Sequence, residues 1–147
     1  MGNNNEIPKK GLCSDSSYSI SSKILEWQVV DIETKEILYH NGLYSETPYI
    51  NNLGEVFGLI KAIKICIDND LNLPIYCDSA SAIAWVKNSK VNTSITNEKL
   101  LKMVAAGEQY LVFAKEYLNF PQVLKWRTKT NSEGNGWGEI LADFNRK

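Results

Sequence analysis

The chain has 147 residues, enough for one domain, and 44% of them are hydrophobic, which favours a buried core over a disordered chain. No run of about 18 apolar residues occurs, so we expect no membrane-spanning helix, and the amino terminus lacks the basic-then-apolar pattern of a secretory signal. The net charge is −1 with only two arginines, which argues against nucleic-acid binding by bulk positive charge or by arginine contacts to bases.

Cysteine usage indicates a reducing compartment. The three cysteines are an odd number and form no Cys-x-x-Cys pair, so neither a disulfide framework nor a structural zinc site is expected. The sequence therefore predicts a cytoplasmic protein with reduced thiols.

The first third of the chain has the pattern of antiparallel strands. Residues 1–10 are polar and aperiodic and predict a flexible tail before one domain over residues 11–147. A short apolar segment then ends in the turn-prone sequence Asp15-Ser16-Ser17. Residues 23–31 and 36–44 are rich in β-branched and aromatic residues. With the first segment at 11–15, they predict a meander of three strands.

The period then changes to that of a helix. Apolar residues recur at steps of three and four from Leu53 to Ile67, which predicts a helix over 51–68 with Asn52 as its N-cap. The elements predicted after it are a strand at 73–77, helices at 80–86 and 97–118, a strand at 122–126 and a terminal helix or turn at 138–146. This order indicates an α/β fold whose five-stranded mixed sheet has three antiparallel strands, then parallel strands, flanked by helices.

Four acids fall at the ends of the predicted elements. Asp15 ends the first strand, Glu55 lies in the first turn of the long helix, Asp78 ends the fourth strand and Asp143 lies in the last helix. Carboxyl ends of adjacent central strands open onto one crevice, and clustered carboxylates there would need hard cations such as Mg²⁺ or Mn²⁺. Taken singly, each acid also has a structural interpretation. Asp15 could be a turn residue, Glu55 a capping-box partner of Asn52, Asp78 an N-cap and Asp143 a solvated acid.

Three sequence blocks resemble bacterial type 1 ribonuclease H over roughly residues 11–147. The blocks are Asn51-Asn52-Leu53-Gly54-Glu55, the segment Ile75–Lys87 with its Asp78-Ser79, and Trp137–Lys147. The last is similar to the carboxyl terminus of one bacterial subgroup, Trp-Gly-Glu-Ile-x-Ala-Asp-x-x-Arg-Lys. The resemblance implies a ribonuclease H-like fold and an endonuclease that hydrolyses the RNA strand of RNA–DNA hybrids, leaving 3′-hydroxyl and 5′-phosphate ends.

The resemblance also implies roles for individual residues. Asp15, Glu55, Asp78 and Asp143 would hold two Mg²⁺ ions, with Mn²⁺ as a possible substitute. Glu139 would assist product release or metal exchange, unless it is a solvent-facing helix acid. Hydroxyl and amide groups suit a hybrid because it is recognised through 2′-hydroxyls and helix shape. The implied substrate-binding residues, which could equally be caps or loop residues, are Ser16, Ser17, Asn51, Asn52, Ser79, Thr93, Ser94 and Thr128.

Two departures from the family pattern bear on selectivity and catalysis. After Asp15 the chain has serines where the family has glycines and an asparagine that approach the RNA closely, so selection of RNA is either relaxed or performed by the serines. The loop at 129–136 is longer than in the subgroup, is rich in Gly and Asn, and lacks the catalytic histidine that many relatives carry. We expect this loop to be mobile beside the site. The single histidine, His40, is expected to be structural.

Other functions remain open from the sequence alone. One is a catalytically silent hybrid-binding domain with the same fold, which the altered segment after Asp15 favours. Another is a DNA-directed nuclease or integrase-like relative with the same metal site. Apart from a hybrid, we expect no membrane and no obligate protein partner, and hence a monomer.

Overall fold

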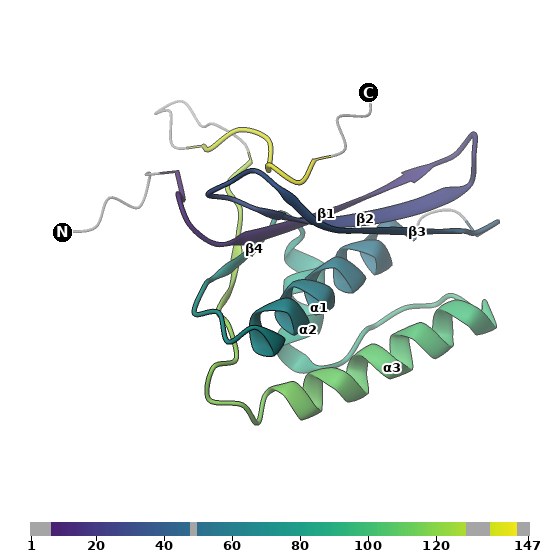
Figure 1. Ribbon diagram of the computed structural model, residues 1–147. Coiled ribbons are helices and arrows are strands. Elements are labelled where there is room, and N and C mark those ends of the chain that lie inside the picture. Colours follow the sequence, from purple (N-terminus) through teal and green to yellow (C-terminus); the bar gives the residue numbers. More distant parts are fainter. Residues whose placement is uncertain (1–6, 48–49, 129–135, 144–147) are drawn as a thin grey trace.

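The antiparallel half of the sheet is built from three long strands near the start of the chain. They are β1 (Leu12–Ser19), β2 (Ile24–Asp31) and β3 (Ile37–Tyr44), and each pairs antiparallel with the next. In the computed structural model the described residues are 7–47, 50–128 and 136–143, and Figure 1 shows their arrangement. In β2, Leu25, Trp27 and Val29 are buried on one face of the sheet and Val30 on the other, so this strand is covered on both faces toward its end.

The parallel half of the sheet follows the first helix. β4 (Ile75–Cys77) pairs parallel with β1, and β5 (Val123–Lys125) pairs parallel with β4, which gives the strand order β3-β2-β1-β4-β5. The helices are α1 (Asn51–Asp68), α2 (Ala80–Asn88) and α3 (Glu98–Ala114). The chain thus has the predicted α/β fold, a five-stranded mixed sheet with three antiparallel strands and then parallel strands, flanked by helices. None of the helices in the described part of the chain is long and apolar enough to cross a membrane.

The central strand β1 is covered on both faces. On one face α1 packs against the sheet through a large apolar cluster that includes Leu12, Leu25 and Leu59, and α3 lies beyond α1 (Figure 1). On the other face Cys13 belongs to a second cluster together with the carboxyl-terminal segment 136–143. Side chains of successive strand residues point to opposite faces, so β1 can contribute to both clusters and to a site at its edge.

Several predicted boundaries were wrong for local physical reasons. β1 runs to Ser19 rather than ending at Asp15, because backbone pairing with β2 continues from Ser16 to Ser19 and overrides the turn preference of serine. The cap of α1 is Ile50, without a side-chain bond, so Asn52 is not its N-cap and the proposed capping box is not formed. Helix α3 ends at Ala114, four residues before its predicted end, in a run of turns.

The carboxyl-terminal element is the turn, and not the helix, of the two alternatives that the sequence left open. Residues 138–143 form a turn at Leu141 and Ala142 and no helix, and residues 144–146 of the predicted element lie outside the described residues. Residues 129–135 of the predicted mobile loop and residues 1–6 of the predicted tail lie outside them as well. His40 is placed on the exposed side of β3, where its Nε2 lies 2.8 Å from Glu26 Oε1 of β2.

Candidate metal centre

The pairing of β1 and β4 stops after two residue pairs, and this opens a gap at their carboxyl ends. The pairs are Leu12–Ile75 and Cys13–Tyr76. Asp15 and Asp78 each come two residues after the second pair, so they occupy equivalent positions past the point where the strands part. Side chains two residues apart share a face, and the electrostatic influence of Asp78 on Asp15 agrees with this proximity.

Glu55 reaches the same gap from α1. Its side chain is 3% exposed, and its Oε1 accepts hydrogen bonds from the Ser16 backbone N–H at 3.1 Å and the Ser16 hydroxyl at 2.9 Å. Its Oε2 accepts from the Cys77 thiol at 3.2 Å. Glu55 is therefore held from β1 and β4 at once, and is not a helix cap.

Close approach of α1 to β1 makes this geometry possible. A Cβ on Gly54 would lie 2.8 Å from the Cβ of Ser16 and 2.9 Å from Leu25 Cδ1, and one on Gly58 would lie 3.2 Å from Ser14 Cβ. Any larger residue at Gly54 would push the helix from the strand. The glycine of the Asn-Asn-x-Gly-Glu block thus has a packing role that the sequence did not show.

Asp15 and Asp78 are crowded against Glu55 and shielded from water, and both of their pKa values are raised. Burial raises the pKa of Asp15 to about 10, with further contributions from a hydrogen bond to Glu55 and from the charges of Glu55 and Asp78. Burial and the Glu55 charge raise the pKa of Asp78 to about 6, although Lys125 opposes the rise. Among the described residues, no lysine or arginine lies within ion-pair distance of these three carboxylates.

The donor chemistry of the cluster fits a divalent cation. Glu55, Cys77 and Asp78 each offer one ligand atom, and these atoms lie within 4.8 Å of one another. Asp15 adds a carboxylate in contact with Glu55. Carboxylate oxygens are the ligands that Mg²⁺ and Mn²⁺ prefer, and a bound cation would allow neighbouring carboxylates to ionise together.

The carboxyl-terminal segment brings Glu139 toward this edge. Tyr76, Trp126 and Trp137 stack edge-to-face with ring centroids 5.0–6.0 Å apart, and Trp126 Nε1 donates to the Gly138 carbonyl at 2.8 Å. The next residue, Glu139, is exposed, and its charge acts on Asp78.

Asp143 is placed through a residue that the sequence reasoning missed. Gln28 of β2 lies opposite Asp15 in the β1–β2 ladder, and its Nε2 donates to the Ala142 carbonyl at 2.6 Å. Asp143 directly follows Ala142 and is half-buried. Gln28 is 8% exposed. In the sequence it is a single amide between the apolar residues Trp27 and Val29, and this pattern was the signal that could have marked it as a functional residue.

The predicted substrate-binding residues nearest the acids are placed around the start of α1 and α2. Asn51 and Asn52 lie exposed in the first turn of α1, and the Ser16 hydroxyl is 2.7 Å from Asn51 Oδ1. Ser17 is half-buried on β1. Ser79, not Asp78, caps α2, because its hydroxyl accepts from the Ala82 backbone N–H at 3.2 Å.

The other predicted substrate-binding residues lie outside the acid cluster. Thr93 and Ser94 belong to the irregular segment between α2 and α3, where Thr93 Oγ1 accepts from the Ile95 backbone N–H. Thr128 follows β5, and its buried hydroxyl has no hydrogen-bond partner among the described residues. No hydrogen bond joins these side chains to Asp15, Glu55 or Asp78 within the described residues.

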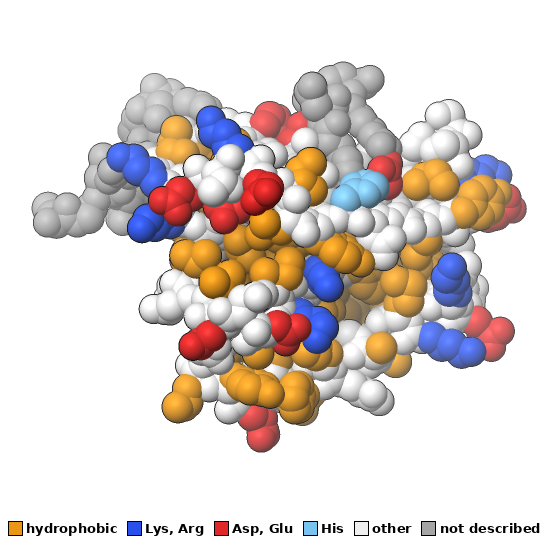
Figure 2. All heavy atoms as spheres, viewed as in Figure 1, with side chains coloured by type: hydrophobic (Ala, Val, Ile, Leu, Met, Phe, Trp, Pro, Cys, Tyr) orange, Lys and Arg blue, Asp and Glu red, His pale blue; other side chains and the backbone are white. Residues whose placement is uncertain are grey.

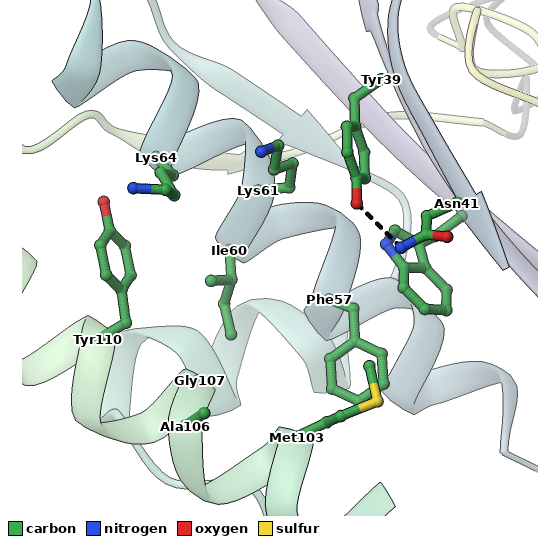
Figure 3. A pocket seen from close by; sticks show the side chains of 11 residues that line it. Tyr39, Asn41, Phe57, Ile60, Lys61, Lys64, Met103, Ala106, Gly107 and Tyr110 are labelled. Atoms are coloured by element: carbon green, nitrogen blue, oxygen red, sulfur yellow. Dashed lines mark hydrogen bonds between the residues drawn. The ribbon is translucent and has the colours of Figure 1, made fainter. Parts of the chain in front are cut away.

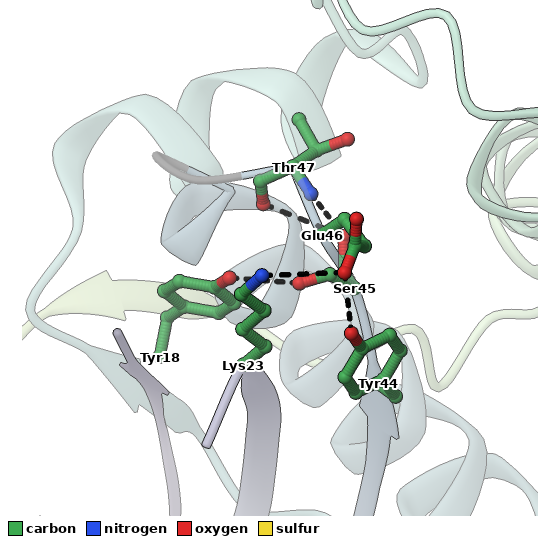
Figure 4. Close-up of polar contacts among 6 residues, drawn as sticks. All are labelled: Tyr18, Lys23, Tyr44, Ser45, Glu46 and Thr47. Atoms are coloured by element: carbon green, nitrogen blue, oxygen red, sulfur yellow. Dashed lines mark hydrogen bonds and ion pairs between the residues drawn. The ribbon is translucent and has the colours of Figure 1, made fainter. Parts of the chain in front are cut away.

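A polar cluster ties the end of the β1–β2 hairpin to the segment before α1 (Figure 4). The Tyr18 hydroxyl donates to the Ser45 carbonyl at 2.7 Å, and Glu46 Oε1 accepts from Lys23 Nζ at 3.2 Å and from the Tyr44 hydroxyl at 2.5 Å. These contacts fix the strand end from which the chain leads toward Asn51. The cluster joins these two segments and holds none of the acids.

The chain has a second concave region, between β3, α1 and α3. This cavity of about 380 Å³ is walled by aromatic and aliphatic side chains, with Lys61 and Lys64 beside the rings of Tyr39 and Tyr110 (Figure 3). In the space-filling view it forms an apolar hollow with two lysines (Figure 2). It contains no acid among its lining residues, so the carboxylate cluster is the stronger candidate for chemistry.

Comparison with known proteins gives ribonuclease H structures at low sequence identity. No family model matches the sequence. RNase H1 from the halophilic archaeon Halobacterium salinarum is 17% identical, with 79% of this chain and 82% of that chain covered and a TM-score of 0.42. The N-terminal RNase H domain of a Mycobacterium tuberculosis protein is 15% identical, with 81% of this chain and 88% of that chain covered and a TM-score of 0.45. A ribonuclease H domain from Desulfitobacterium hafniense, in its apo form, is 16% identical, with 86% of this chain and 80% of that chain covered and a TM-score of 0.31.

Proposed function

We propose that the chain is a metal-dependent endonuclease that hydrolyses the RNA strand of RNA–DNA hybrids, with residues 11–147 as its catalytic domain. The observation that carries this proposal is the meeting of Asp15, Glu55 and Asp78 at the parted ends of β1 and β4. Three acids from three elements converge there, and Asp15 and Glu55 are buried in mutual contact. Such an arrangement is costly without a cation to neutralise it.

Asp15, Glu55, Asp78 and Asp143 would hold the ions. When bound, two Mg²⁺ ions, or Mn²⁺ in their place, would supply an activated water and neutralise charge on the departing 3′-oxygen. The products would carry 3′-hydroxyl and 5′-phosphate ends. Glu139 is exposed near Asp78 and is suited to exchange of ions or product at the rim.

The chain's own residues would prepare the site in two ways. Ser16 fixes the Glu55 carboxylate through its backbone N–H and hydroxyl, so that this ligand is oriented before a cation arrives. Gln28 fixes the backbone before Asp143. Preorganised ligands lose less freedom on binding, which favours tight coordination.

Substrate contacts would come from exposed amides and hydroxyls around the acids. Asn51, Asn52 and Ser79 lie beside the cluster, and Ser17 lies further along β1, where they could meet the minor groove of a hybrid. The side chain of Ser16 is 6% exposed and already bonded to Asn51 and Glu55, so we propose that it positions Glu55. Any contact of Ser16 with the substrate would come from its backbone. Thr93, Ser94 and Thr128 would bind a phosphate of the DNA strand.

The test is cleavage of a matched substrate panel. Labelled RNA–DNA hybrid, double-stranded RNA and double-stranded DNA of one sequence are incubated with the protein and Mg²⁺, and then with Mn²⁺. We expect cutting of the hybrid alone, in its RNA strand, with 5′-phosphate ends. Cutting of double-stranded DNA would replace the proposal by the DNA-directed alternative. Binding of the hybrid without cutting in either metal would replace it by the silent binding domain.

A further inference from the structure

Cys77 lies among the acids of the proposed metal centre. Its sulfur donates to Glu55 Oε2 at 3.2 Å and accepts from the Ser79 backbone N–H at 3.4 Å. The residue is fully buried, and its Sγ belongs to the group of three potential ligand atoms that it forms with Glu55 and Asp78. A soft sulfur donor thus stands beside two hard oxygen donors.

The sulfur–oxygen spacing of Cys77 and Glu55 is close to the ligand spacing around a tetrahedral thiophilic cation. Zn–S and Zn–O bonds of about 2.3 and 2.0 Å place a sulfur and an oxygen ligand about 3.5 Å apart. The Cys77–Glu55 separation is 3.2 Å, and all three atoms lie within 4.8 Å of one another. Mg²⁺ gains little from sulfur, whereas Zn²⁺ and Cd²⁺ bind thiolates strongly.

We propose that Cys77 makes the centre sensitive to thiophilic divalent cations, which bind through its sulfur together with Glu55 and Asp78 and exclude Mg²⁺. On binding, the S–H bond breaks, its proton passes to solvent, and a sulfur–metal bond replaces the hydrogen bond to Glu55. Because Glu55 and Asp78 are ligands of both kinds of ion, the two compete for the same side chains. This inference rests on the proposed function for the Mg²⁺ role of those two acids.

The experiment uses Co²⁺ and Cd²⁺ as probes on the whole chain, without nucleic acid. Stoichiometric Co²⁺ should produce a thiolate-to-metal charge-transfer band in the wild type, and Mg²⁺ in excess should reduce it. Cys77→Ser, which keeps a small donor for Glu55, should lose the band and bind Cd²⁺ at least ~10-fold more weakly. Cys77→Ala, which lacks any donor, should lose the band as well.

Cys66→Ser is the matched control. Cys66 is also buried and free, but it lies eleven residues after Glu55 in α1, about 16 Å further along the helix axis. This variant should keep the band. Absence of the band in the wild type would overturn the inference, and this result does not depend on whether any variant folds. A band that survives in Cys77→Ser would overturn it as well. Failure of the nuclease proposal would appear separately, as a lack of hybrid cleavage in Mg²⁺ and Mn²⁺.

Discussion

Replacing Asp15 by asparagine should stabilise the metal-free protein. Folding buries Asp15 beside Glu55 and raises its pKa from 3.8 to about 10. The folded chain therefore holds a proton that the unfolded chain releases above pH 3.8. For an acid shifted in this direction, stability is fully present below the unfolded pKa and is lost as pH rises toward the folded pKa. The neutral amide of the Asp15→Asn variant carries no such proton and avoids the loss.

The magnitude follows from one proton carried into the fold. Each pH unit between the two pKa values costs about 1.4 kcal/mol, so the stability of Asp15→Asn relative to wild type should rise by up to about 3 kcal/mol between about pH 5 and pH 7. Saturating Mg²⁺ should stabilise the wild type more than the variant, because a cation allows Asp15 to ionise and the variant lacks that ligand.

Urea unfolding followed by tryptophan fluorescence, in EDTA and then in Mg²⁺, measures both effects. The matched control is Glu116→Gln, which removes one negative charge from an exposed position beyond the end of α3. Its stability should stay within about 0.5 kcal/mol of wild type at both pH values. A gap between Asp15→Asn and wild type that does not change with pH would refute the reasoning, as would a variant less stable at pH 7.

Three further changes test other parts of the account. Gly54→Ala forces a Cβ to 2.8 Å from Ser16 and should lower the free energy of unfolding in urea by about 1–3 kcal/mol. The control Gly107→Ala on α3 meets only a flexible Ile side-chain end and should be neutral or stabilising. Equal losses in the two variants would contradict the close approach of α1 to β1. Ser79→Ala removes the cap of α2 and should lower the unfolding free energy by about 1 kcal/mol, and no loss would mean that another group caps the helix. Because the pKa of Asp15 is raised to about 10 and that of Asp78 to about 6, a bound cation displaces a proton from Asp15 up to pH 7 and a second proton from Asp78 below about pH 6. Mg²⁺ affinity measured calorimetrically should therefore fall more steeply with pH below about 6 than above it, and an equal slope on both sides would argue against Asp78 as a ligand.

Periodicity predicted the elements well where the core decides them. The helix Asn51–Asp68 has its predicted bounds, because its apolar face must cover the sheet. The prediction failed where backbone pairing with a distant segment competes with local preference. Ser16–Ser19 look like a turn but complete the ladder with β2, and no local signal reveals that partner.

The candidate site was predictable in composition and not in geometry. Asp15, Glu55 and Asp78 were singled out because acids at strand and helix ends share an edge, and the fold brings these three together. What holds them could not be seen. The Ser16 and Cys77 bonds to Glu55 depend on three-dimensional contact between residues far apart in the chain, as does the reach of Gln28 to Ala142.

The most direct test of the central claim is hybrid cleavage as a function of Mg²⁺ concentration, in wild type and in Asp78→Asn. Asp68→Asn is the control, since Asp68 lies on the exposed surface of α1, where it pairs with Lys64. We predict saturable cleavage by wild type and control, and a loss of about 10²–10³-fold in Asp78→Asn, corresponding to several kcal/mol of transition-state stabilisation. Equal cleavage by all three proteins would contradict the assignment of catalysis to this cluster.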